Sequence, residues 1–170
     1  MIEGNMLLDG SRELGFALDG KAFDKFSLYK KLLLEWNEKF NLTAVTDDVE
    51  IDIKHFLDSI TVINLLPEKQ ALKIIDVGTG AGFPGIPIKI MKPGTELVLL
   101  DSLNKRLKFL DEVILQLNLE SIRTIHSRAE DAGRDVLYRE KFDVSVSRAV
   151  ANLKVLSEYC LPLVKVNGLF

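Results

Sequence analysis

Cysteine, histidine and net positive charge are all scarce in this sequence, and each shortage excludes a class of protein. The 170 residues contain one cysteine, Cys160, so an internal disulfide framework is excluded. The two histidines, His55 and His126, show no metal-ligand spacing and no cysteine accompanies them, so we predict no metal site. The net charge of −3 argues against a general nucleic-acid binder, which means that any contact with RNA must come from local basic clusters.

Long apolar runs and a leader pattern are also missing. Apolar stretches such as Leu97 to Leu100 are far shorter than the roughly 20 residues that a membrane-spanning helix needs. The first residues show no basic segment followed by an apolar run, which is the pattern of a signal peptide. We therefore expect a cytoplasmic protein with no membrane partner, and a monomer, although the sequence itself carries no signal for the oligomeric state.

Residues 1–70 are predicted to form a helical segment that packs on the rest of the chain. Apolar residues recur with a period of 3.6 residues between Phe23 and Phe40, as on one face of a helix. Asp47 followed by Glu50 resembles a capping box that opens a further helix. Pro67 ends the apolar helical stretch that follows, and no strand pattern precedes residue 72.

From residue 71 to residue 170 the pattern changes to strands that alternate with helices. Strands are predicted at residues 72–77, 96–101, 121–126 and 142–147, and a fifth begins near Leu163. This alternation predicts an α/β fold, with a mostly parallel, Rossmann-like sheet covered by helices on both faces. The chain stops in or after the fifth strand, so we expect a shortened form of a longer protein with its C-terminal strands missing.

The strongest motif is Asp76-Val77-Gly78-Thr79-Gly80-Ala81-Gly82, which begins at the end of the first strand. Glycines let the backbone turn sharply and approach a ligand, and the helix that begins near Gly85 would direct free N–H groups at a carboxylate or phosphate. Asp76 suits the amino group of a methionine, so we predict binding of S-adenosylmethionine. Residues 80–85 also match the dinucleotide pattern G-x-G-x-x-G, so a dinucleotide site stays open, as does a plain tight turn.

Polar residues follow the other strands at the same edge of the sheet. Asp101 ends the second strand, where it would accept hydrogen bonds from two ribose hydroxyls or cap the helix after Ser102. Arg128 and the pair Ala129-Glu130 follow the third strand, at the end that faces an adenine. Arg148 follows the fourth strand, where an arginine more often contacts a ligand than solvent.

Five sequence motifs, spread over nearly the whole chain, are more specific than the glycine loop alone. They are Trp36 to Thr43, His55 to Ser59, Asp76 to Pro87, Leu100 to Arg106 and Ser147 to Val150. Together they resemble the GidB (RsmG) family, which are bacterial small-subunit 16S rRNA methyltransferases that modify guanine N7. The most specific part is the Gly-Phe-Pro-Gly-Ile-Pro sequence that ends at Pro87 and extends the glycine loop.

The resemblance implies a class I methyltransferase fold that binds S-adenosylmethionine, releases S-adenosylhomocysteine and acts on ribosomal RNA or the small ribosomal subunit. It implies a role in RNA binding or activity for Arg128. The resemblance, the glycine loop and the end of the second strand together predict the cofactor-binding residues. These are Asp76, Gly78, Gly80, Phe83, Asp101, Ser102, Leu103, Ala129, Glu130 and Arg148. Family members continue beyond residue 170 with a Lys-Gly element and a final antiparallel strand pair.

The expected reaction is a single in-line displacement in which guanine N7 attacks the methyl carbon. N7 carries an in-plane lone pair, so no general base is needed, and the alignment of two reactants can contribute roughly 7 to 11 kcal/mol. Arg128 and Arg148 would position the substrate by holding a phosphate or guanine O6. A small-molecule methyltransferase, a dinucleotide-dependent oxidoreductase and a module that only binds the cofactor remain alternatives.

Overall fold

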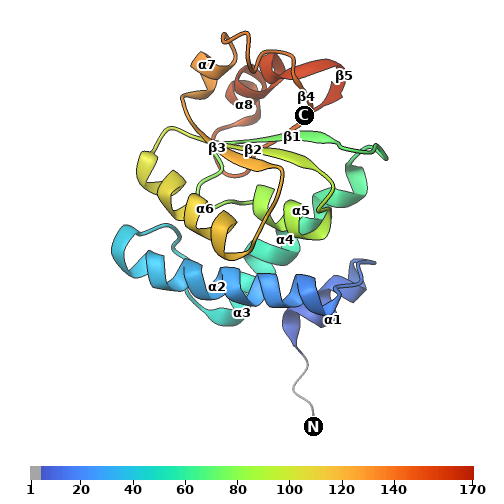
Figure 1. The fold of residues 1–170 in the computed structure, drawn as a ribbon, viewed down its shortest axis with the longest axis vertical. Helices are drawn as coiled ribbons and strands as arrows, with labels where there is room; N and C mark the ends of the chain where they lie inside the picture. Colours follow the sequence, from blue (N-terminus) through green and yellow to red (C-terminus); the bar gives the residue numbers. More distant parts are fainter. Residues whose placement is uncertain (1–4) are drawn as a thin grey trace.

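A computed structural model describes residues 5–170, which form a parallel sheet with helices on both faces (Figure 1). Its strands are β1 (Lys73–Val77), β2 (Glu96–Asp101), β3 (Ile122–His126), β4 (Phe142–Val146) and β5 (Val164–Leu169). All the pairings are parallel, in the order β3-β2-β1-β4-β5. The predicted α/β fold class is therefore confirmed, and each strand begins within about one residue of its expected position.

The described part of the N-terminal segment is helical, as predicted. Its elements are α1 (Met6–Glu13), α2 (Gly20–Phe40), α3 (Asp48–Ile51), the π-helical turn η1 (Asp52–Leu57), α4 (Asp58–Thr61) and the 3-10 turn η2 (Val62–Leu65). The helices between and after the strands are α5 (Gly85–Met91), α6 (Asn104–Gln116), α7 (Ala129–Ala132), α8 (Leu153–Cys160) and the 3-10 turn η3 (Leu161–Leu163). Among the described residues, no helix combines the length and apolarity that a membrane span needs.

The strand order changes direction at β1, which lies between β2 and β4. The chain runs from β1 outward through β2 to β3, then returns to the other side of β1 to form β4 and β5. Asp76 of β1 lies beside Val146 of β4, so the loops that follow these two strands leave the sheet as neighbours. In open α/β sheets, ligands bind at such a switch point, outside the carboxyl ends of the strands.

One apolar core joins the helical segment to the sheet. Figure 1 shows α5 and α6 between the sheet and the layer formed by α2, whereas α7 and α8 cover the opposite face. Phe26, Tyr29 and Leu33 of α2 are fully buried and belong to the same cluster as Ile86 of α5 and Leu110 of α6. Because apolar surface from both parts is removed from water together, the helical segment helps to stabilise the sheet.

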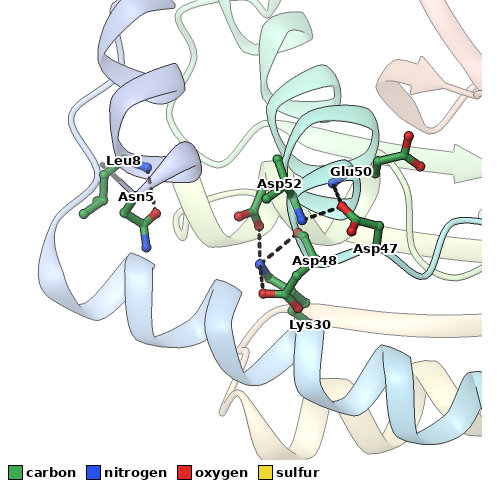
Figure 2. A network of polar contacts seen from close by, with 8 residues as sticks. Asn5, Leu8, Lys30, Asp47, Asp48, Glu50 and Asp52 are labelled. Carbon is green, nitrogen blue, oxygen red and sulfur yellow. Dashed lines mark hydrogen bonds and ion pairs between the residues drawn. The ribbon is translucent and has the colours of Figure 1, made fainter. Parts of the chain in front are cut away.

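A largely buried ion pair ties α2 to the turn that follows α3 (Figure 2). Lys30 Nζ lies 2.7 Å from Asp52 Oδ1 and 3.3 Å from Asp48 Oδ2. Asp47 caps α3 by accepting the N–H groups of Val49 and Glu50, at 3.0 and 2.9 Å. The carboxylate of Glu50 pairs with Lys54 at 2.6 Å, so Asp47 acts as an ordinary N-cap and no reciprocal capping box forms.

We expect Lys30→Met to lower the free energy of unfolding by about 2 kcal/mol or more, because Asp52 would remain buried without its cation. Urea unfolding followed by circular dichroism measures this. Lys31→Met is the matched control, since the ion pair of Lys31 with Glu35 spans 3.9 Å and its side chains are 70% and 56% exposed. The free energy of unfolding of the control should stay within about 0.5 kcal/mol of that of the parent chain. Equal losses in the two variants would contradict a stabilising role for the ion pair of Lys30 with Asp52.

Candidate cofactor and substrate site

A cavity of about 730 Å³ opens at the carboxyl ends of the strands, within the range of small-molecule sites. Three parts of the chain form its wall: the glycine loop after β1, the ends of β2, β3 and β4, and the helical segment. The helical segment contributes Leu42, Thr43, Lys54, His55 and Asp58. The cavity is therefore shared between the helical segment and the α/β part.

Most of the predicted site residues line this cavity. They are Gly78, Gly80, Phe83, Asp101, Ser102, Arg128, Ala129, Glu130 and Arg148. Asp76 and Leu103 are not part of the wall, although both contact residues that are. The structure thus brings residues from four separate stretches of sequence to one place.

The glycine loop packs too tightly for side chains at two of its positions. A Cβ atom on Gly82 would lie 2.7 Å from the Tyr29 hydroxyl, and the residue has a φ of +99°. A Cβ atom on Gly78 would lie 2.5 Å from a methyl group of Val150, with a φ of +67°. Glycine is therefore required here by backbone conformation and by contact together.

Asp76 supports the loop from beneath. Its side chain is fully buried, and Oδ2 accepts hydrogen bonds from the Thr79 hydroxyl at 2.7 Å and the Gly85 N–H at 2.9 Å. Oδ1 has no hydrogen-bond partner within the described part of the chain. Burial raises the pKa of Asp76 to about 6, although the hydrogen bonds from Thr79 and Gly85 oppose this shift.

Asp101 forms a second anchor for the loop. Its Oδ2 accepts the Gly80 N–H at 2.9 Å and a guanidinium N–H of Arg106 at 3.2 Å, and its Oδ1 accepts the Leu103 N–H at 2.9 Å. A carboxylate offers about four acceptor positions, so these bonds leave about one open. To accept hydrogen bonds from two ribose hydroxyls, Asp101 would have to lose one of these three donors. The Arg106 guanidinium is the donor expected to move, because its contact is the longest.

Arg148 joins the helical segment to the glycine loop. One guanidinium nitrogen donates to the Lys54 carbonyl at 3.0 Å and to Asp58 Oδ2 at 2.5 Å, and the other lies 3.2 Å from His55 Nδ1. Its central carbon lies 5.1 Å from the centre of the Phe83 ring, a cation–π contact. The guanidinium of Arg148 is thus held mainly by protein groups.

His55 completes this junction. Its ring stacks on Phe83 with centroids 4.5 Å apart and planes inclined by 15°. Nε2 lies 2.8 Å from the Thr43 hydroxyl. Burial and the neighbouring cation of Arg148 lower the pKa of His55, so the neutral ring predominates at neutral pH.

Arg128 differs from Arg148 in its surroundings. It is exposed, it lines the cavity, and within residues 5–170 its guanidinium makes no hydrogen bond or ion pair with protein groups. An exposed guanidinium at the mouth of a cavity is suited to bind a phosphate.

Comparisons with known proteins identify the family. The family described as rRNA small subunit methyltransferase G (GidB) matches residues 22–170, which include both the helical wall and the glycine loop. The chain belongs to this family. The resemblance expected from the sequence is thereby confirmed.

Relatives in the rRNA small subunit methyltransferase G family are closely similar over most of the chain. The proteins of that name from Clostridium kluyveri and Acetivibrio thermocellus are 58% and 57% identical over 159 and 165 residues. These alignments cover 94% and 97% of this chain but only 67% and 68% of the relatives. The crystal structure of a SAM-dependent methyltransferase from Aquifex aeolicus shares the fold, with a TM-score of 0.51 and 21% identity over 70% of this chain and 63% of that one.

Tyr29 supports the cavity wall from within the core, and the sequence motifs did not identify this role. It lies on the buried face of α2, donates its hydroxyl proton to the Ala81 carbonyl, and packs on Phe83 with ring centroids 5.4 Å apart. The helical period between Phe23 and Phe40 places Tyr29 on the apolar face and indicates no more than an apolar contact. The signal that could have found it was its hydroxyl, because a buried tyrosine normally has a hydrogen-bond partner.

Asp76 should make stability depend on pH. The ordinary pKa of an aspartate is 3.8 and that of Asp76 in the fold is about 6, so protonation favours folding and this contribution is lost as the pH rises through 6. Relative to Asp76→Asn, which does not titrate, the parent chain should lose about 1.4 kcal/mol of unfolding free energy between pH 5 and pH 7.5. Urea unfolding of both proteins at the two pH values measures this, and parallel changes would contradict it.

Proposed function

We propose that this chain transfers a methyl group from S-adenosylmethionine to N7 of a guanine in small-subunit ribosomal RNA. The observation that carries the proposal is that the family match, residues 22–170, includes every part of the cavity wall. The named relatives are rRNA small subunit methyltransferases, which supports RNA as the substrate class. The choice of guanine N7 rests on the resemblance of the sequence motifs.

The residues present fit S-adenosylmethionine. Gly78 and Gly80 line the cavity without side chains of their own, Asp101 keeps an open acceptor position for a ribose hydroxyl, and Ala129-Glu130 line the part of the cavity expected to hold the adenine. The unpartnered Oδ1 of Asp76 supplies negative charge beneath the loop, which suits a cationic ligand. Ser102 and Phe83 complete the wall, and Leu103 acts through its hydrogen bond to Asp101.

S-adenosylmethionine supplies an activated methyl group, so that the bond from guanine N7 to carbon forms as the bond from sulfur to carbon breaks. The protein's task is alignment. Arg148, His55 and Tyr29 hold the loop and Phe83 in one arrangement, and Arg128 holds the RNA through a phosphate or guanine O6. No side chain is required to remove a proton, because the N7 lone pair lies in the plane of the base.

Methyl transfer is tested with labelled S-adenosylmethionine and purified small subunits that lack the modification. We expect label in the RNA, and mapping of the methylated base should locate it at guanine N7. Naked small-subunit RNA and free guanosine are parallel substrates that separate an assembled, a naked and a small-molecule acceptor. Label in guanosine alone would contradict the proposal, as would binding of NAD in place of S-adenosylmethionine by calorimetry.

Arg128→Ala should lower kcat/KM for small subunits about tenfold, because one contact with the RNA is lost. The Kd for S-adenosylmethionine should change less than about twofold, and the slope of log affinity for RNA against log salt should fall by about 1. Arg134→Ala is the matched control, since Arg134 is also exposed but does not line the cavity. Equal loss of cofactor binding and methylation in Arg128→Ala would refute the assigned role.

A further inference from the structure

Thr43 occupies a fixed place in the helical wall of the cavity. It follows the end of α2, where Asn41 adopts a left-handed conformation with a φ of +47°. The Thr43 N–H donates to the side-chain oxygen of Asn37 at 2.9 Å, and the Val45 N–H donates to the Thr43 hydroxyl oxygen at 3.1 Å. The residue is partly buried and faces the cavity.

The hydrogen bonds around His55 determine which nitrogen carries its proton. The guanidinium of Arg148 can only donate, so His55 Nδ1, 3.2 Å away, must accept. In the neutral ring the proton is then on Nε2, and Nε2 donates to the Thr43 hydroxyl oxygen at 2.8 Å. Arg148 therefore sets the tautomer of His55, and His55 sets the orientation of the Thr43 hydroxyl.

The Thr43 hydroxyl oxygen consequently receives two hydrogen bonds, from Val45 and from His55. A hydroxyl group has two lone pairs and one proton, so both lone pairs are occupied and only the proton remains. No acceptor for this proton is present among the protein groups of residues 5–170. Because Thr43 lines the cavity, the proton can be donated to a ligand there.

We propose that Thr43 is a binding residue that donates a hydrogen bond to an acceptor oxygen of a bound ligand, and that His55 is the positioning residue that directs this donor. The inference rests on the proposed function and deepens it. Two ligand oxygens have the required chemistry: a carboxylate oxygen of the methionine part of S-adenosylmethionine, and O6 of the guanine. Both are acceptors without a proton, so each matches a hydroxyl that can only donate.

The first test removes the hydroxyl and keeps the side-chain volume. Thr43→Val should weaken either the affinity for S-adenosylmethionine, measured by calorimetry, or kcat/KM for small subunits at saturating S-adenosylmethionine, by about five- to tenfold. Loss of affinity assigns the acceptor to the methyl donor, and loss of kcat/KM alone assigns it to the base. Thr43→Ser should restore the affected quantity to within about threefold, and no change in either quantity would overturn the proposal.

Thr124→Val is the matched control. Thr124 also donates its hydroxyl in a hydrogen bond, to Asp111 at 2.7 Å, but it lies on β3 and does not line the cavity. Neither affinity nor kcat/KM should change in this variant. Urea unfolding of Thr43→Val and Thr43→Ser shows whether a loss of affinity or of kcat/KM is due to the missing hydroxyl or to a less stable fold. If both variants lose affinity or kcat/KM in proportion to their loss of stability, the proposal is overturned.

The role of His55 is tested in the His55→Phe background, which keeps an aromatic ring to stack on Phe83 but fixes no hydroxyl. Thr43→Val should then cost less than about twofold, since the donor is no longer directed. An undiminished effect in this background would refute the role of His55. If the parent chain binds S-adenosylmethionine but methylates no RNA, only the proposed function fails. The proposal for Thr43 is then decided by the affinity of Thr43→Val for S-adenosylmethionine: a five- to tenfold loss supports it, and an unchanged affinity overturns it.

Discussion

The arrangement of the cavity wall depends on the contact between the flat guanidinium of Arg148 and the ring of Phe83, with the ring of His55 stacked on the same phenylalanine. Phe83 belongs to the glycine loop, His55 to the π-helical turn, and Arg148 to the segment after β4. The bonds of Arg148 to Lys54 and Asp58 complete a junction between positions that lie 94 and 90 residues apart in the sequence. Without this junction the helical segment would still share a core with the sheet, but it would not be fixed against the loop that lines the cavity.

The glycine loop is held from three directions. Asp76 binds Thr79 and Gly85 from beneath, Asp101 binds Gly80 from the side, and Tyr29 binds the Ala81 carbonyl from the helical segment. Backbone groups of a loop that must stay open to a ligand cannot all be satisfied within regular secondary structure, so side chains supply the partners. The loop is therefore arranged before any ligand arrives, which reduces the cost of ordering it on binding.

Local patterns account for what could be predicted from the sequence. Apolar strands that end in Asp76 and Asp101, and the glycines between them, identify the sheet, its strand ends and the residues that line most of the cavity, because strand and turn signals are local. Local patterns could not predict the π-helical turn at Asp52–Leu57, the hydrogen-bond partner of the Tyr29 hydroxyl or the protein partners of Arg148. Each depends on contacts between distant segments, and such contacts place Arg148 where it joins two parts of the protein.

A double-mutant cycle between Asp58→Asn and Phe83→Leu tests most directly whether the helical segment and the loop form one site through Arg148. Asp58 and Phe83 both contact the Arg148 guanidinium, so each single variant should weaken binding of S-adenosylmethionine. Calorimetry on the four proteins should show that the second substitution costs at least about 0.5 kcal/mol less when the first is already present. Strictly additive losses, or unchanged affinity in Asp58→Asn, would contradict a site that is shared by the two parts of the chain.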